Sequence, residues 1–264
     1  MVLSVCAFGQ GGPPFLTDDP DTPGNNNWEI NIGLIGDRNP SEGTYSTPEL
    51  DINYGIRDRI KLTYRLPLAI HESRDSGESV AGGLGNSLLG VKYRFFEHRD
   101  RSKPDDSEPT CSLSVYPQLV LNNPTRSVAR NVAEPAPQFL LPVETAFRIG
   151  PVQFVGETGY WFTTKDTSDS WIRGVMAGHE FKKGTDVYLE IYDRSDVRAV
   201  GAKPKQREST LGVGGRKAIA KQGSVLLLGM AGRSIANITV DNGQPQWIAY
   251  VGMEFLTGKS GGGK

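Results

Sequence analysis

From residue 27 to residue 256, apolar and polar residues alternate in segments of about ten residues, and turn-forming residues separate the segments. The clearest segments are 28–36, 49–56 and 60–68, where nearly every second side chain is apolar and most residues between them are polar, charged or Gly. This period of two is typical of a β-strand with one apolar and one polar face. The chain is therefore predicted to be built from β-strands.

Nine further segments extend the pattern and bring the predicted number of strands to about twelve. Those at 171–181, 210–216 and 224–232 alternate less clearly than the others. The nine segments are 84–96, 113–121, 139–148, 152–162, 171–181, 187–192, 210–216, 224–232 and 247–255.

The connections between the predicted strands alternate between short and long. Those after the second, sixth, eighth and tenth segments are short, such as Gly150–Pro151, whereas most of the others are longer and polar, such as 122–136. Short turns at one end and long loops at the other are typical of outer-membrane barrels, whose short turns face the periplasm. An even strand number would place both chain ends on that side. The connection 97–110 is an exception, because it is long where a short turn is expected.

Alternation alone also fits a soluble β-sandwich or barrel, so other features have to decide. Charges of both signs recur on the polar faces, as a wet interior requires, and aromatic residues gather near the two ends of the apolar faces. In hydrocarbon every backbone N–H and C=O needs a partner, which excludes an open sheet edge. The predicted fold class is all-β: a single antiparallel up-and-down transmembrane β-barrel of about 12 strands.

Composition excludes several other classes of protein. Of the 264 residues 37% are hydrophobic, and the mean hydropathy is -0.38. No apolar run approaches the roughly 20 residues of a transmembrane helix. The net charge is -1 and there is no basic stripe, so nucleic acid is not expected as a partner. Cys6 and Cys111 are too few for a disulfide framework.

Outside the predicted barrel, residues 27–256, the chain divides into three short segments. Residues 1–9 are interpreted as the remnant of a signal peptide, because Val2–Phe8 is apolar, although it lacks a positively charged start. Residues 10–26 are rich in Pro, Gly, Asp and Asn and are predicted to be irregular. Residues 257–264 are expected to form a flexible tail.

Two passages resemble a family of outer-membrane transporters named for the meta-pathway of phenol degradation. In Gly12–Gly33 a Thr-Asp-rich stretch precedes a Trp-Glu strand, as in that family. Residues 83–93, GLGNSLLGVKY, resemble its G-x-G-D-x-x-x-G-x-K-Y strand, with Asn86 where Asp is more usual. The resemblance covers the N-terminal third by motif and the rest by architecture. It implies a membrane barrel and the passage of small molecules that are often aromatic or apolar.

The charges on the predicted inner faces are the candidate functional residues of the lumen. Basic residues from two consecutive strands would form a patch, and acidic residues from later strands would face it. Such a transverse field orients polar solutes in porins. The alternative is that the charges only pair and rigidify a narrow barrel. The candidates are Lys61, Arg65, Lys92, Arg94, Glu144, Glu157 and Glu190.

Asp18, Asp19 and Asp21 are candidates for a plug. Residues 12–26 precede the first strand and carry charge opposite to the basic patch, so they are predicted to fold into the barrel mouth or lumen. One alternative is a Ca²⁺ site, since carboxylates are its preferred ligands. The other is ordinary turn chemistry at Asp-Pro. No metal ion and no cofactor is predicted.

Catalytic chemistry is not predicted from this sequence. The three histidines, His71, His98 and His179, fall on predicted loops or an apolar face, and there is no G-x-S-x-G, H-E-x-x-H or phosphate-loop motif. We expect a monomeric outer-membrane protein of a Gram-negative bacterium that lets small solutes cross passively. The alternatives are a non-conducting outer-membrane structural or binding barrel and a soluble ligand-binding β-barrel.

The expected partners follow from this interpretation. They are outer-membrane lipid, a small-molecule solute and the barrel-assembly machinery. The last is expected because the final predicted strand ends on an outward aromatic residue, Phe255, as barrel-assembly signals do.

Overall fold

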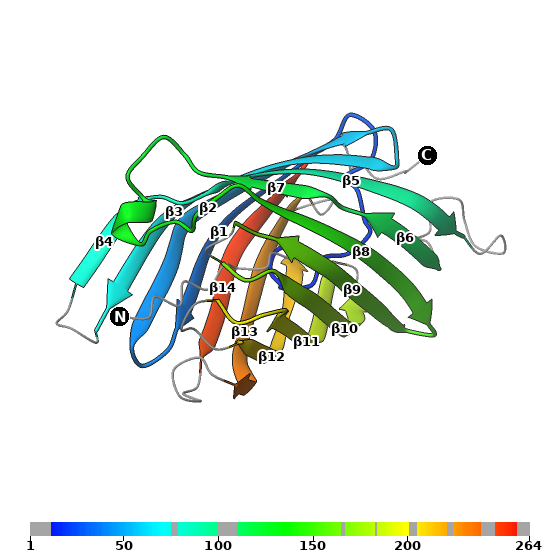
Figure 1. The fold of residues 1–264 in the computed structure, drawn as a ribbon. Coiled ribbons are helices and arrows are strands. Elements are labelled where there is room, and N and C mark those ends of the chain that lie inside the picture. Colours follow the sequence, from blue (N-terminus) through cyan, green and yellow to red (C-terminus); the bar gives the residue numbers. More distant parts are fainter. Residues whose placement is uncertain are drawn as a thin grey trace.

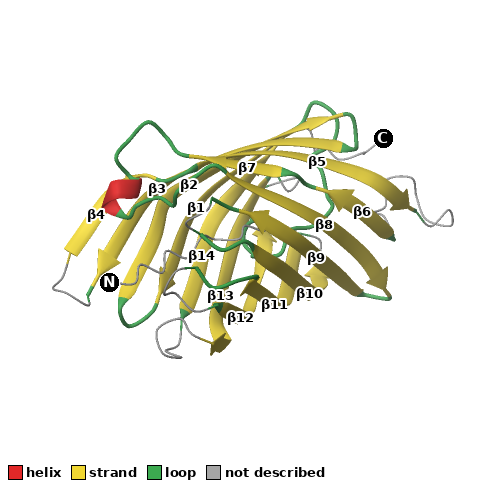
Figure 2. Ribbon diagram, in the orientation of Figure 1, coloured by secondary structure: helices red, strands yellow, loops and turns green. Residues whose placement is uncertain are grey.

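A computed structural model describes residues 12–74, 79–99, 110–164, 167–182, 184–200, 205–220, 224–238 and 246–257. These residues form one antiparallel sheet that closes on itself into a barrel (Figures 1 and 2). Its strands are β1 (Trp28–Arg38), β2 (Glu42–Ile56), β3 (Ile60–Ser73), β4 (Ser79–Leu84), β5 (Ser87–His98), β6 (Cys111–Val115), β7 (Gln118–Leu121), β8 (Gln138–Ile149), β9 (Val152–Phe162), β10 (Ser170–Lys182), β11 (Thr185–Asp196), β12 (Arg207–Ala218), β13 (Val225–Ile238) and β14 (Trp247–Leu256).

Two of the barrel positions are each occupied by a pair of short strands. β4 and β5 follow one another along β3, and Gly85 and Asn86 interrupt them. β6 and β7 follow one another along β8, and Tyr116 and Pro117 interrupt them. Pro117 has no N–H to donate to the ladder, which explains this break. The fourteen segments therefore occupy twelve positions, and the predicted 12-stranded barrel is confirmed.

Pairing between the first and last strands closes the barrel. Residues 29–38 of β1 lie opposite residues 247–256 of β14 in an unbroken antiparallel register. Closure removes the open edges that a sheet of this size would otherwise expose. Within the described part of the chain, β4 has a ladder partner on one side only. Arg130, in the 3₁₀ turn Val128–Arg130, donates a hydrogen bond to the carbonyl of Gly82 on β4 at 2.9 Å.

The outer face of the wall is apolar and the inner face is largely polar, the reverse of a water-soluble protein. Large apolar side chains face outward, and Leu34, Val175 and Val251 are 53%, 59% and 59% exposed. Inward-facing residues beside them, such as Asn31 and Glu190, are buried. This is the arrangement in which hydrocarbon, rather than water, surrounds the wall.

Aromatic residues gather at both ends of the outer face. We call the end at the Arg57–Arg59 turn the turn end, and the opposite end the loop end. At the turn end the rings of Trp28 and Tyr54 are 4.6 Å apart. At the loop end those of Tyr160 and Trp171 are 4.9 Å apart. Two such belts mark the interfaces of a membrane protein.

The strands differ from the predicted segments mainly in length. β2 begins at Glu42 rather than at residue 49. A register irregularity between Ser46 and Glu49 interrupts the alternation, and the strand continues on both sides of it. The weakly alternating segments all form strands. The predicted signal remnant 1–9, most of the tail 257–264 and most of the connection 97–110 lie outside the described residues. No helix among the described residues is long and apolar enough to cross a membrane.

Candidate functional site: the barrel interior

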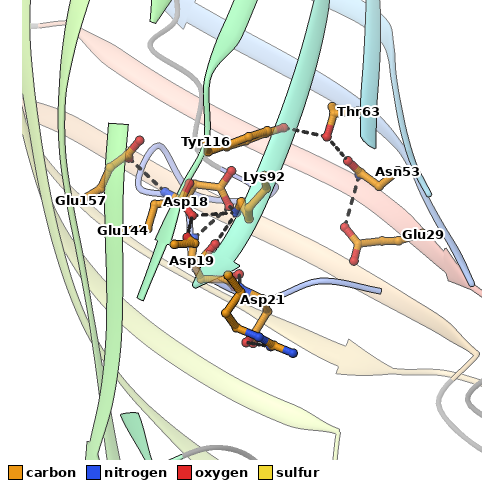
Figure 3. Close-up of polar contacts among 12 residues, drawn as sticks. Asp18, Asp19, Asp21, Glu29, Asn53, Thr63, Lys92, Tyr116, Glu144 and Glu157 are labelled. Atoms are coloured by element: carbon orange, nitrogen blue, oxygen red, sulfur yellow. Dashed lines mark hydrogen bonds and ion pairs between the residues drawn. The ribbon is translucent and has the colours of Figure 1, made fainter. Parts of the chain in front are cut away.

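The segment 12–26 lies inside the barrel without regular secondary structure. Its backbone binds acidic side chains of the wall. The N–H of Thr17 donates to Oε1 of Glu190 at 2.6 Å. The N–H of Asp18 donates to Oε2 of Glu157 at 3.1 Å (Figure 3). Thr17 is 1% exposed and Asp18 is 3% exposed. The two wall carboxylates thus satisfy backbone donors that would otherwise be unpaired in the interior.

Lys92, on β5, joins this segment to Glu144 on β8. Its Nζ lies 2.9 Å from Oδ1 of Asp18 and 3.0 Å from Oε2 of Glu144, and it also donates to the carbonyl of Asp19 (Figure 3). Ser114 donates a hydrogen bond to Glu144. Lys92 and Glu144 have no solvent-exposed side-chain surface. A charge buried to this extent is tolerated only when partners and hydrogen bonds compensate it.

Burial and charge act in opposite directions on the carboxyl group of Asp18. Burial raises its pKa, but the positive charges of Lys61 and Lys92 lower it by more, and the pKa lies below its ordinary value. Asp18 is therefore ionised at neutral pH and acts as the counter-ion of the two lysines.

Tyr116 connects the lysines to a chain of polar side chains. Its ring lies 4.6 Å from Nζ of Lys92 and 5.2 Å from Nζ of Lys61. Its hydroxyl donates to Thr63 Oγ1 at 2.7 Å, and Thr63 donates to Asn53 Oδ1 at 2.6 Å. Asn53 in turn donates to Glu29 at 3.3 Å (Figure 3). This chain fixes the wall of β1 to β3 beneath the bound segment.

The remaining two basic candidates have different partners. Arg94 lies 3.6 Å from Asp21 and 3.0 Å from Glu97, so it joins the segment to the wall. Arg65 instead lies 3.8 Å from Glu49, a neighbour on the adjacent strand. Of the four predicted basic residues, Lys92 and Arg94 therefore form ion pairs with the acidic segment.

An apolar contact holds the start of the segment on the other side of the lumen. The ring of Phe15 meets that of Tyr188 edge-on, with centroids 5.6 Å apart. Phe15 is 7% exposed, and Leu16 packs beside it. The buried wall residues of the same cluster are Ala146, Val155, Met176, Tyr188, Leu228, Met230, Ile248 and Tyr250. The sequence pattern indicated a lumen of mixed charge and missed this apolar surface.

Gly174, on β10, makes room for the segment at its tightest point. A Cβ atom at this position would lie 2.1 Å from Oγ1 of Thr17. Any side chain larger than hydrogen would therefore collide with the bound segment. Gly174 has no distinguishing motif in the sequence, because it stands among several strand glycines.

The end of the segment is fastened to the turn between β2 and β3. Thr22 donates to the carbonyl of Asp58 at 2.9 Å, and Asn26 donates its N–H to the carbonyl of Gly55 at 2.9 Å. A Cβ on Gly55 would lie 1.9 Å from the carbonyl oxygen of Gly24. The chain therefore reaches β1 through a close backbone contact that only glycine permits.

A cavity of about 370 Å³ remains between the segment and the wall near the turn end. Charged residues of both signs and apolar residues line it together. Small amphipathic molecules are of the size and chemistry that such a space accepts. The wall residues that line it include Glu29, Lys61, Arg94, Gln153, Val155, Met176, Tyr188, Arg216 and Glu254.

The predicted candidates lie together on the interior side of the wall or in the segment beside it. Lys61, Arg65, Lys92, Arg94, Glu144, Glu157 and Glu190 are all buried. The three segment carboxylates diverge: that of Asp18 faces Lys92, that of Asp19 accepts from the N–H of Asp21, and that of Asp21 faces Arg94. No group of three or more His, Cys, Asp or Glu among the described residues is placed to hold a metal ion.

The histidines do not converge in space. His71 is buried on β3, and His98 ends β5. His179 contacts the carbonyl of Pro151 at 2.9 Å through Nδ1. Each belongs to a different part of the wall.

Comparison with known proteins identifies the class of fold. No protein-family model and no curated protein matches the sequence. Among solved structures, the COG4313 outer membrane channel from Pseudomonas putida F1 matches with a TM-score of 0.68 and 14% identity, over 90% of this chain and 98% of that chain. The chain therefore has the fold of outer-membrane β-barrel proteins.

Two further structures support this class. The translocator domain of the autotransporter NalP from Neisseria meningitidis matches with a TM-score of 0.57 and 8% identity, over 88% of this chain and 89% of that chain. The KdgM porin matches with a TM-score of 0.55 and 9% identity, over 86% of this chain and 98% of that chain.

Proposed function

We propose that this protein is an outer-membrane channel for the passive passage of small molecules, and that residues 12–26 plug its lumen. The observation that carries the proposal is the position of this segment. It is anchored inside the barrel by Lys92, Glu157 and Glu190, while the outside of the same barrel is apolar. A barrel of twelve strands lies between those filled by side chains and those with an open pore.

The interior supports solutes with both polar and apolar parts. Lys61, Arg94 and Arg216 line the cavity together with Val155 and Met176. The resemblance to the transporter family named for the meta-pathway of phenol degradation favours small aromatic or apolar solutes. We propose membership of that family on the motif at residues 83–93 and the stretch before Trp28.

The remaining features of the proposal follow from this assignment. The protein is a monomer in the outer membrane of a Gram-negative bacterium, and residues 1–9 belong to its signal peptide. It has no catalytic role. The outer-membrane channel and the porin among the similar folds support transport rather than catalysis.

A liposome uptake assay tests the proposal. Purified barrel is reconstituted, and the entry of aromatic acids, hydrocarbons and sugars is compared with that into empty liposomes. We expect faster entry of small amphipathic solutes than of sugars. Entry no faster than into empty liposomes, for both the full chain and a variant without residues 12–25, would contradict transport.

A non-conducting structural or binding barrel is the second candidate. The filling of the interior favours it, because Phe15 of the segment and Lys92 and Tyr116 of the wall are all buried. Planar-bilayer recording separates the two, since a structural barrel stays silent even after residues 12–25 are removed. A soluble barrel is disfavoured because it would expose the apolar outer face to water, and soluble proteins rarely expose apolar patches of that size.

A further inference from the structure

The outer wall carries a row of cationic and aromatic side chains at the loop end. Arg38 on β1 and Arg233 on β13 lie directly opposite Trp247 on β14, one on each side of it. All three are exposed, Trp247 by 55%. Adjacent strands are about 4.8 Å apart, so the two arginines are separated by about 10 Å with the indole between them.

The arginines of this row are available to a ligand. Cζ of Arg233 lies 5.0 Å from the centre of the Trp247 ring, which orients the guanidinium without neutralising it. Arg38 interacts electrostatically with Glu72, but the carboxylate of Glu72 is already paired with Arg74 at 2.7 Å. In the part of the chain that the structure describes, no carboxylate lies within ion-pair distance of Arg38 or Arg233.

A second row on the neighbouring strands adds to the positive charge. Arg173 on β10 and Arg207 on β12 lie 3.2 Å and 2.9 Å from the same carboxylate, that of Asp193 on β11. Both arginines are 54% exposed. Arg38 and Arg233 add two positive charges, and the Glu72–Arg74 pair that interacts with Arg38 is neutral, so the surface has a net positive charge.

The position of the two rows along the barrel axis indicates which part of the membrane they contact. Trp171 and Trp247 belong to the aromatic belt of the loop end, and such belts lie at the level of lipid headgroups. Arginine side chains at this level extend along the wall toward charged headgroups. Guanidinium binds phosphate through two parallel hydrogen bonds. In an outer membrane, the loop end is the outer-leaflet end.

We propose that Arg38, Trp247 and Arg233 bind phosphate groups of the glycolipid that forms the outer leaflet. The row of Arg173, Asp193 and Arg207 extends the same positive surface around the wall. This assignment rests on the outer-membrane location proposed above, but it does not depend on conduction.

Titration of the purified barrel in detergent with diphosphorylated lipid A, followed by native mass spectrometry, tests the site. We expect R38Q/R233Q to weaken binding about tenfold, because each arginine near a charged headgroup contributes separately. The matched control is R57Q/R59Q, which removes two exposed arginines from the turn end and should change the affinity less than twofold. Dephosphorylated lipid A should bind wild-type protein as weakly as the double variant binds the phosphorylated lipid.

Three results would overturn the proposal. They are equal binding by wild type and R38Q/R233Q, equal binding of the phosphorylated and dephosphorylated lipids, and displacement of the lipid by equimolar inorganic phosphate. Heat-modifiable migration in gels verifies that each variant is folded. Failure of the wild-type protein to insert into bilayers would defeat the outer-membrane location itself. Loss of the arginine dependence in an inserted barrel would defeat only the lipid site.

Discussion

The two halves of the barrel interior differ in the kind of side chain they present. The inner faces of β1 to β5 are mostly polar and charged, whereas those of β8 to β14 carry most of the buried apolar side chains, interspersed with polar and charged residues. The polar half includes Asn31, Asp51, Asn53, Lys61, Arg65, Lys92 and Arg94. The apolar half includes Leu140, Val155, Trp161, Ile172, Met176, Leu228 and Ile248.

The segment 12–26 matches this division. Its first residues, Phe15 and Leu16, pack on the apolar half, and Asp18 and Asp21 form ion pairs with the charged half. The segment is therefore held by two contacts that depend on different physics. Ionic strength and pH act on the charged contact, whereas the apolar contact depends on buried area.

Removing the charge of Lys92 should have the largest effect. In K92M the carboxylates of Asp18 and Glu144 lose their common counter-ion at complete burial, and breaking such a buried pair costs about 3–5 kcal/mol. The free energy of unfolding, measured by urea titration in vesicles, should fall by that amount. The matched control is K217M, which removes the charge of an exposed lysine on β12 and should change the free energy of unfolding far less. Equal losses in the two variants would show that the ion pairs do not matter.

Truncating Phe15 should release the apolar contact. F15A leaves a cavity against Tyr188 and its neighbours, and we expect docking to weaken by about 2–3 kcal/mol, less than in a closed protein core. The open probability of single channels in planar bilayers should rise. L34A, on the lipid-facing wall, serves as control and should leave it unchanged. An F15A channel that opens no more often than L34A would mean that the apolar half does not hold the segment.

A methyl group on Gly174 tests the closest approach between segment and wall. G174A should displace Thr17 and weaken docking by about 1–3 kcal/mol, as expected for overpacking. The second change T17G should restore wild-type conductance, because it removes the atoms that collide. The control G229A adds a methyl group whose nearest contact, the carbonyl oxygen of Tyr250, would be 3.9 Å away. If T17G does not rescue G174A, the collision is not the cause.

The smallest expected effect is the pH dependence carried by Asp18. Burial raises the pKa of this carboxyl, but Lys61 and Lys92 lower it by more, so it lies below its ordinary value of 3.8. Because the pKa of Asp18 is lower in the docked segment, its ionised carboxylate stabilises docking fully at a pH above the ordinary pKa. This contribution is lost as the pH falls through the lowered pKa. The conductance of D18N should therefore exceed that of wild type at neutral pH, and the difference should vanish in acid. A difference that is the same at pH 7 and well below pH 3.8 would exclude this role.

The fold and the charged half of the interior were open to prediction from the sequence. Period-two alternation assigns each residue to a face, so Lys61, Lys92 and Glu190 fall on the polar side once the strands are recognised. The strand number follows from the same pattern. The acidic character of residues 18–21, opposite in charge to the basic patch of β3 and β5, predicts that the segment folds into the barrel mouth or lumen.

The apolar half could not be predicted in this way. In β9 the alternation places Trp161 on the same face as Glu157, but it does not show that this apolar side chain is buried. In β10 the outer face also holds Arg173 and His179, so the pattern does not distinguish Ile172 from its outward-facing neighbours. Their burial depends on contacts between distant strands and with the segment itself. Close approaches such as Thr17 to Gly174 join positions far apart in the chain, and no local pattern encodes them.

Single-channel conductance with and without residues 12–25 tests the central claim most directly. The full chain should pass little current in a planar bilayer. The deletion variant, verified as folded by heat-modifiable gel migration, should show a severalfold larger and stable conductance, because Lys92, Glu157 and Glu190 then line an open path. The same conductance in both proteins would contradict the claim that this segment plugs the barrel.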